Sequence, residues 1–148
     1  MTAFAKAAPL GCLLALAALP ALAADGAEVF SEACAACHNE GGIGNPGLAP
    51  ALNRPGFWSA LGEDAVPYVS GVMTSGLAGM IQAGGQTYAG LIMPPVAGYD
   101  DDALAAAASY VLQELGGLGT AVTAADVAAA REAHPSHSAL RAMRPAAE

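Results

Sequence analysis

Two cysteines and a histidine stand close together near the start of the chain, in the run Cys34-Ala35-Ala36-Cys37-His38. Two thiols at this spacing serve as a structural disulfide, a redox-active dithiol, half of a zinc site or an attachment point for haem. The adjacent imidazole favours haem, because attachment needs two thiols one helical turn apart and the iron needs a neighbouring axial ligand. We therefore expect Cys34 and Cys37 to attach one haem covalently and His38 to bind its iron.

The other uses of this motif need partners that the sequence supplies poorly. A zinc site requires two more ligands, and only His134 and His137 near the end of the chain could provide them. A thioredoxin-like dithiol belongs to alternating strands and helices, whereas this sequence shows mostly helical patterns and Gly-rich loops. A protein with a Cys34–Cys37 disulfide would be colourless, which separates that alternative from a haem protein.

The iron of such a haem needs a second axial ligand. A thioether that crosses the far face must come from an extended segment, and prolines both stiffen such a segment and prevent a helix. Met93, followed by Pro94 and Pro95, meets this requirement, whereas Met73 falls in a helical pattern and Met80 is the rival. With Met93 bound the iron is saturated, which predicts electron transfer; an open position would predict a ligand-binding sensor or an enzyme. The remaining candidates are Met143, His134 and His137.

The attachment motif falls at the end of a predicted helix. Asp25 and Glu28 form a capping-box pattern, and apolar residues follow at helical spacing through Cys37. Residues 39–56 contain five Gly and three Pro without periodicity, so we expect a loop around one edge of the haem.

Further helical patterns follow this loop. Asp64 is placed to cap one helix whose first turn contains Pro67, and the pair Thr123 and Asp126 forms a capping box for another. A short turn over 57–61 precedes them, a second loop rich in Gly and Pro over 76–98 carries Met93, and the last dozen residues are expected to fray. The predicted helices cover residues 63–75, 101–115 and 124–133.

The first 23 residues read as an export signal. One cation, Lys6, precedes an apolar run from Leu10 to Leu22, and this run is shorter than the roughly 20 residues that a membrane-spanning helix needs. Small residues near its end predict cleavage after Ala23, with an uncleaved anchor as the alternative. We therefore expect a periplasmic protein that has lost Lys6 and Cys12 and has no transmembrane segment in the mature chain.

The composition excludes several classes of protein. The 148 residues are 55% hydrophobic but only 5% aromatic, with a mean hydropathy of +0.44, which is too apolar for a disordered chain. Thirteen acidic residues against five basic ones exclude nucleic-acid binding. Small side chains alone fill an interior poorly, so we expect haem to take the place of an aromatic core and the chain to fold poorly without it.

The segment from Gly26 to Gly117 resembles a class I c-type cytochrome, with an attachment motif near its start, a Pro-containing loop, a Met-Pro loop and a closing amphipathic helix. The resemblance implies an all-α, cytochrome c-like fold of about four helices wrapped around one haem c. It also divides the chain into a signal peptide over 1–23, a cytochrome c domain over 24–117 and a helical extension with a tail over 118–148.

Several single residues match this family. Gly26, Phe30 and Cys34 correspond to its four-residue ladder, in which the glycine allows the last helix to cross closely and Phe30 packs on Tyr110. Ala107 stands where many relatives carry a larger aliphatic residue. Pro50 corresponds to the proline whose carbonyl accepts a hydrogen bond from the ligating histidine, and the family's habits suggest Arg54, Trp58 and Tyr88 as donors to the haem propionates.

The resemblance implies a redox protein as partner, namely a periplasmic dehydrogenase, oxidase or reductase. Without lysine the mature chain cannot dock as mitochondrial cytochromes do, so docking is expected to be apolar or onto a basic surface. The stretch over 81–95 is similar to cytochrome subunits of bacterial periplasmic dehydrogenases that oxidise sulfite or alcohols. A dedicated dehydrogenase subunit therefore stands beside a freely diffusing electron carrier as an alternative.

Overall fold

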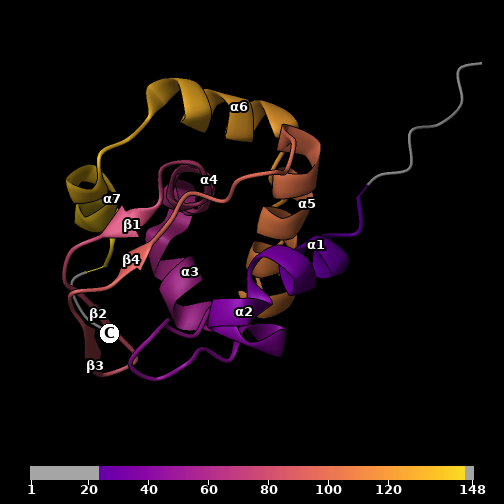
Figure 1. The fold of residues 1–148 in the computed structure, drawn as a ribbon. Coiled ribbons are helices and arrows are strands. Elements are labelled where there is room, and N and C mark those ends of the chain that lie inside the picture. The colour runs from indigo at the N-terminus through magenta and orange to yellow at the C-terminus, as the bar shows by residue number, and fades with distance from the viewer. Residues whose placement is uncertain (1–23, 146–148) are drawn as a thin grey trace, which may run out of the picture.

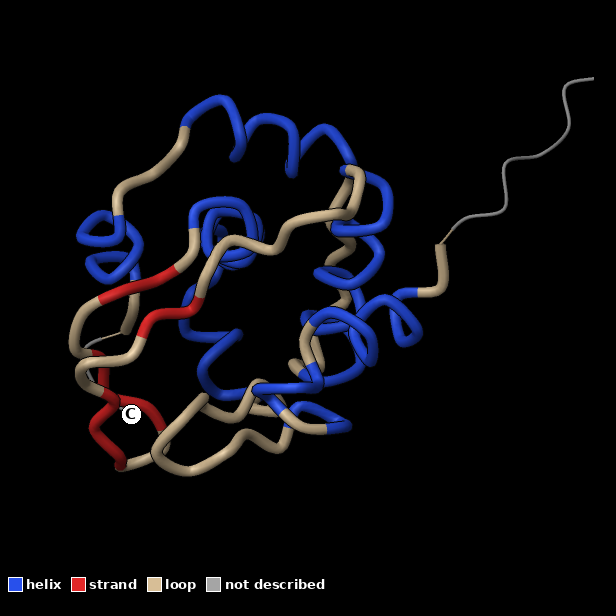
Figure 2. The backbone as a smooth tube through the Cα atoms, in the orientation of Figure 1, coloured by secondary structure: helices blue, strands red, loops and turns tan. Residues whose placement is uncertain are grey.

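The structure is a computed structural model that describes residues 24–145, and the chain in this range is mostly helical (Figures 1 and 2). The predicted signal over 1–23, its cleavage site after Ala23 and Cys12 lie outside the described residues. Within the described range, no helix combines the length and the apolar character needed to cross a membrane.

The predicted first helix is present but is broken at Cys34. Helix α1 covers Gly26–Ala33 and α2 covers Ala35–His38. Asp25 caps α1, since its carboxylate accepts hydrogen bonds from the backbone N–H groups of Ala27 and Glu28. Figure 1 shows α2 turned away from the axis of α1. With Cys34 at the N-cap of α2, both cysteines and His38 fall within one short helical turn.

Helix α5, Asp101–Tyr110, crosses α1 at close range. A Cβ atom on Gly26 would lie 2.3 Å from the carbonyl oxygen of Ala106, so only glycine permits this approach. The rings of Phe30 and Tyr110 pack with centroids 5.3 Å apart. The close crossing predicted from the Gly26 ladder is confirmed, and the last turn of the predicted helix, Val111–Leu115, is a π-helix instead of an α-helix.

Two helices, α3 and α4, lie between the loop that follows the attachment motif and the loop that carries Met93. Helix α3 covers Pro55–Leu61, where only a short turn was expected, and α4 covers Ala65–Ser75. The α4 helix begins two residues later than predicted because a 3₁₀ turn occupies Gly62–Asp64. Asp64 does stand at the N-cap position, but its side chain makes no capping hydrogen bond, so that part of the prediction is wrong.

The second loop contains two short antiparallel hairpins that the sequence patterns did not reveal. Strand β1, Leu77–Ala78, pairs with β4, Ile92–Met93, and places Leu77 opposite Met93. Strand β2, Ile81–Ala83, pairs with β3, Gln86–Tyr88, across a turn at Gly84 and Gly85. Met93 is therefore held in an extended strand, as the two prolines after it require.

The C-terminal extension forms two helices that pack on the body of the protein. Helix α6 covers Ala124–Ala133, as predicted, and the capping box of Thr123 and Asp126 is confirmed. Helix α7 covers His137–Met143, so the expectation of a frayed tail is wrong for these residues: Leu140 is completely buried against Gly71 of α4. Figure 1 shows α6 over α4 and α5, and α7 beside β1.

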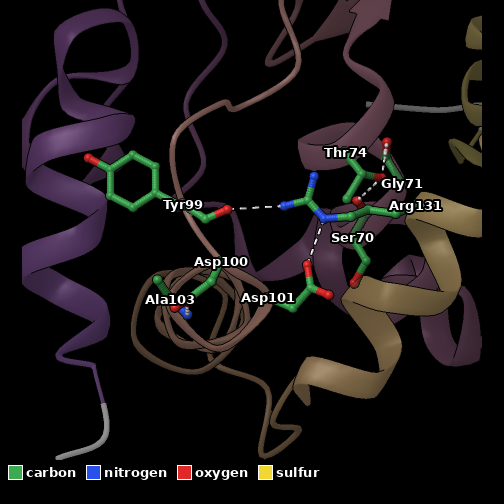
Figure 3. A network of polar contacts seen from close by, with 8 residues as sticks. All are labelled: Ser70, Gly71, Thr74, Tyr99, Asp100, Asp101, Ala103 and Arg131. Carbon is green, nitrogen blue, oxygen red and sulfur yellow. Dashed lines mark hydrogen bonds and ion pairs between the residues drawn. The ribbon is translucent and has the colours of Figure 1, made fainter.

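An arginine ties α6 to the start of α5. Figure 3 shows Arg131 with its guanidinium between the Asp101 carboxylate and the Tyr99 carbonyl oxygen, at distances of 2.6 and 3.2 Å. The neighbouring Asp100 caps α5 by accepting from the Ala103 backbone N–H at 2.8 Å. The extension is therefore joined to the helix that crosses α1, and the core runs continuously from Phe30 to Leu140.

Candidate functional site

A cavity of about 410 Å³ lies inside the ring of helices and is open at one side. This volume falls in the range of about 300–1,000 Å³ that is typical of cofactor sites. Its walls are largely apolar, and they come from α2, the loop after it, α3, α4, the β1–β4 hairpin and the segment that leads into α5. The predicted site residues Cys34, Cys37, His38, Pro50 and Met93 all line this one cavity.

The two cysteines are free thiols on one wall of the cavity. Cys34 is half-buried and Cys37 is exposed. Burial, together with the neighbouring Cys37, raises the pKa of the Cys34 thiol to about 11. A nucleophilic redox cysteine needs the opposite shift, because the thiolate is its active form. The raised pKa therefore argues against redox exchange at Cys34.

A zinc site has no further support in the structure. Among residues 24–145, no three side chains of His, Cys, Asp or Glu gather closely enough to hold a metal ion. His134 lies exposed at the end of α6, and Nε2 of His137 lies 3.2 Å from the Ser75 carbonyl oxygen at the end of α4. The two histidines that a zinc site would need therefore do not lie at the cavity that Cys34 and Cys37 line.

His38 is held in a defined orientation. It is 7% exposed, and its Nδ1–H donates to the Pro50 carbonyl oxygen at 2.8 Å, which is the hydrogen bond that the family resemblance implied. Burial lowers the pKa of His38, and the Pro50 hydrogen bond opposes part of this shift. The imidazole is therefore neutral near pH 7, with Nδ1 engaged and Nε2 left as the possible metal ligand.

The loop that supplies Pro50 is fixed by hydrogen bonds close to His38. The backbone N–H of Gly44 donates to the His38 carbonyl oxygen, and the Asn39 side chain donates to the Gly44 carbonyl oxygen, both at 2.8 Å. A Cβ atom on Gly44 would lie 2.4 Å from the backbone nitrogen of Ala51, so glycine is needed for the loop to fold back. These contacts bring Pro50 within reach of the imidazole.

The methionines differ in where the structure places them. Met93 lines the cavity from β4, and Met73 lines it from the buried face of α4. Met80, the rival in the sequence analysis, is 66% exposed and is not part of the cavity wall. Met143 packs against the core from α7. Met93 is thus the methionine that is both in an extended segment and at the cavity.

The predicted propionate donors have different surroundings. The indole N–H of Trp58 donates to the Leu52 carbonyl oxygen at 2.7 Å, so this donor already has a partner within the protein. Arg54 and Tyr88 line the cavity. The sequence analysis missed Arg144, whose guanidinium lies 2.6 Å from the Tyr68 hydroxyl and 4.8 Å from the Phe57 ring centre. It was missed because it follows a helix that was expected to be frayed.

Charged groups stand at separate places on the cavity wall. Arg54 and Arg144 both lie over the Phe57 ring, at 5.5 and 4.8 Å from its centre, so the two cations share one end of the cavity. Elsewhere on the wall, Tyr99 donates to a Glu32 carboxylate oxygen at 3.4 Å. Partial burial and the Glu32 carboxylate raise the pKa of Tyr99.

Comparison with known proteins places this arrangement in a family. The profile of the Cytochrome c family matches residues 23–114. The chain belongs to the cytochrome c family. This cytochrome is similar to two proteins named cytochrome c-552, both from Thermus thermophilus. The first is 33% identical over 98 residues, covering 66% of this chain and 65% of the relative; the second is 33% identical over 88 residues, covering 60% and 66%.

Family membership settles the fold and the cofactor. The fold is cytochrome c-like and mostly helical, and the cofactor is a covalently bound haem c with one iron per chain. The residues at the cavity fit this group: two free thiols, a neutral imidazole oriented by Pro50 and an apolar interior with cations at one end. The matched region ends at residue 114, so α6 and α7 lie beyond it.

Proposed function

We propose that this cytochrome carries single electrons between redox proteins of the periplasm, with Cys34 and Cys37 attaching the haem and His38 and Met93 as its axial ligands. The observation that supports this most strongly is that all four side chains line one cavity, while Nδ1 of His38 is engaged by Pro50 and Nε2 is left for the iron. When bound, the haem supplies an iron that alternates between the ferric and ferrous states.

His38 serves as the ligand from the α2 side. Its hydrogen bond to the Pro50 carbonyl fixes the tautomer and the ring plane, and it increases the basicity of the free nitrogen. Because burial keeps the imidazole neutral, no proton has to leave before the metal binds. Pro50 is thus a positioning residue that acts through His38.

Met93 serves as the ligand from the opposite segment. Its pairing with Leu77 and the following Pro94 and Pro95 hold the strand extended, so the thioether is presented without a helix. With His38 and Met93 both in place, the chain would supply the same two ligands to the iron in both oxidation states. A thioether ligand also raises the reduction potential relative to a second imidazole.

The cavity wall controls the environment of the haem. Apolar side chains such as Val69, Val72 and Leu77 exclude water, which disfavours the more positive ferric state. The two propionates are the anionic groups of haem c, and we place them toward the end of the cavity where Arg54 and Arg144 share the Phe57 ring. The same cations add to the preference for the ferrous state.

The partner would dock at the exposed edge of the cavity. Leu48 and Ile92 line the cavity and are 45% and 70% exposed, and Cys37 beside them is exposed too. Because residues 24–145 contain no lysine, this edge suits an apolar or a basic partner surface. These features support either a diffusing carrier or a dedicated subunit of a periplasmic dehydrogenase. Copurification from the periplasm with mass spectrometry separates a dehydrogenase from an oxidase or reductase.

The ligand assignment is tested by the absorption spectrum of the haem-loaded protein. Ligation by His38 and Met93 gives a low-spin ferric iron with a weak sulfur-to-iron band in the far red. Met93→Ala should abolish this band, whereas Met80→Ala should retain it because Met80 is exposed. Met73→Leu is a second control, since Met73 lines the cavity from α4. A band that survives in Met93→Ala and vanishes in either control would refute the assignment.

A further inference from the structure

Three side chains on one face of the C-terminal segment donate to backbone carbonyls that are three and four residues apart in the segment over 75–82. Nε2 of His137 lies 3.2 Å from the Ser75 carbonyl oxygen, Arg141 donates to the Ala78 carbonyl oxygen, and Arg144 donates to the Gln82 carbonyl oxygen at 2.9 Å. The donors are four and three residues apart, which puts them on one face of a helix. This face of the C-terminal segment therefore lies along residues 75–82.

Of the three acceptors, Ala78 lies in β1, the strand that pairs with the Met93 strand, while Ser75 ends α4 and Gln82 lies in β2. Leu77 stands opposite Met93 in the β1–β4 pair, and a Cβ atom on Gly76 would lie 2.5 Å from the Met93 carbonyl oxygen. Beyond the pair, the Val96 backbone N–H donates to the Met73 carbonyl oxygen at 2.8 Å. A two-stranded ribbon is marginally stable alone, so the Met93 strand depends on β1 being held in place by its neighbours.

Helix α7 is itself anchored to the body of the protein. Leu140 is completely buried, and its Cδ2 would lie 2.8 Å from a Cβ atom on Gly71, so α7 sits directly on α4. Ser136 caps α7 by accepting from the Ala139 backbone N–H at 3.2 Å. Arg141 also lies against Gly79, where its guanidinium would be 2.6 Å from a Cβ atom. One side of α7 is therefore fixed to the core and the other to β1.

We propose that α7 is a strap that holds the β1–β4 hairpin against the cavity, and that Arg141 is a positioning residue for Met93. The proposal rests on the proposed ligation by Met93. It assigns a role to a helix beyond the region that matches the family: the strap keeps the thioether at the iron and slows the entry of outside ligands. Arg141 is the best test residue, because Arg144 also reaches the cavity and His137 contacts Ser75 at the end of α4 instead of β1.

The strap is tested by the rate at which imidazole replaces Met93 in the ferric protein. At saturating imidazole this rate reports how often the Met93 hairpin opens. Arg141→Gln should raise it about tenfold, because a hydrogen bond from a charged donor is lost, and Arg141→Lys should restore part of the effect. The matched control is Arg131→Gln, which removes an arginine bound to Tyr99 and Asp101 instead of β1. An unchanged rate in Arg141→Gln, or an equal rise in Arg131→Gln, would overturn the proposal.

Backbone hydrogen exchange of the same haem-loaded variants separates the strap from the ligand assignment. Arg141→Gln should speed exchange of the amides in residues 75–82 and 92–96, while the amides of α2 stay as protected as in the unmodified protein. If exchange responds but the far-red band is absent from the unmodified protein, α7 holds the strand pair but Met93 is not the ligand, so the role of Arg141 in Met93 ligation is overturned. If the band is present and exchange of the hairpin is unchanged, Met93 is the ligand and the strap is wrong.

Discussion

The two walls of the haem cavity are built in different ways. On the wall that carries His38, the imidazole is oriented by a hydrogen bond to Pro50, only twelve residues away. The wall that carries Met93 is held from the far end of the chain, since His137 and Arg141 reach back 62 and 63 residues to Ser75 and Ala78. The bond that orients His38 is thus local in sequence, whereas the bonds that hold the segment beside Met93 come from the C-terminal extension.

This difference predicts which side of the site opens first. Closing a longer loop costs more conformational entropy, and the Met93 hairpin consists of only two-residue strands. The His38 side combines a buried imidazole, a capped α1 and a close crossing with α5. Local opening should therefore begin at Met93, and the iron should lose its thioether long before its imidazole.

The largest effect is expected from the attachment cysteines. Replacing both Cys34 and Cys37 by alanine should abolish the covalent haem, and with it most of the folded structure, because the haem fills the place of a core. A haem stain of denatured protein and the far-ultraviolet circular dichroism spectrum measure the two losses. Cys12→Ala is the matched control and should keep both signals. A folded, haem-free double variant would contradict the expectation.

The next effect tests the His38 side through its helix crossing. Gly26→Ala should reduce the free energy of unfolding by about 1–3 kcal/mol, because the new Cβ meets the Ala106 carbonyl oxygen at 2.3 Å. Gly56→Ala in α3 has open space around its Cβ and should be neutral or stabilising by up to about 1 kcal/mol. Denaturant unfolding of the haem-loaded variants measures both values, and equal effects at the two sites would show that the crossing does not stabilise this side.

A smaller effect is expected from the cation that the extension brings to the cavity. Arg144→Gln should lower the reduction potential, since losing a positive charge near the haem favours the ferric state. We expect about a threefold shift in the ferrous-to-ferric ratio at a fixed applied potential, or about 30 mV. Redox titration measures it, with Arg131→Gln as the control that should leave the potential unchanged. A potential that stays constant or rises in Arg144→Gln would show that the guanidinium does not act on the haem.

The smallest effect concerns the start of α6. Hydrogen bonds from Thr123 lower the pKa of Asp126, so the carboxylate stabilises the folded state above its ordinary pKa and this stabilisation is lost as the pH falls through the lowered value. Asp126→Asn should cost at most about 1 kcal/mol near pH 7, with the difference shrinking below about pH 4. Thermal unfolding across this range measures it. Glu132→Gln on the same helix is the control, and an equal loss there would point to net charge instead of the cap.

Sequence patterns predicted the His38 side far better than the Met93 side, for a physical reason. The attachment motif follows from the spacing of its residues, whereas the Gly26 ladder and Pro50 were expected from the family resemblance, and the structure shows the contacts of both. The break in the first helix at Cys34 and the missing capping hydrogen bond of Asp64 were not predicted. Spacing was therefore enough for the motif, and the family resemblance supplied the residues that position it.

The Met93 side could be predicted only in part. The prolines indicated an extended segment, but two-residue strands carry no alternation pattern that would reveal β1 and β4. Helix α7 has only seven residues, so its apolar anchors Leu140 and Met143 are too few to show a helical period. Its bonds go to backbone carbonyls, which any residue provides, so no side-chain pattern marks Ala78 or Gln82 as partners. This is why Arg144 was missed.

The coordination of the iron in both oxidation states is the property that decides most directly between an electron carrier and a ligand-binding haem protein. A redox titration of the haem-loaded protein, followed by its visible spectrum, should show one haem per chain, a single reversible one-electron step and low-spin iron throughout. The ferric form should carry the far-red sulfur band, and the ferrous form should not bind carbon monoxide rapidly. A high-spin spectrum in either state, or rapid carbon monoxide binding, would contradict ligation by both His38 and Met93 and point to a ligand-binding haem protein.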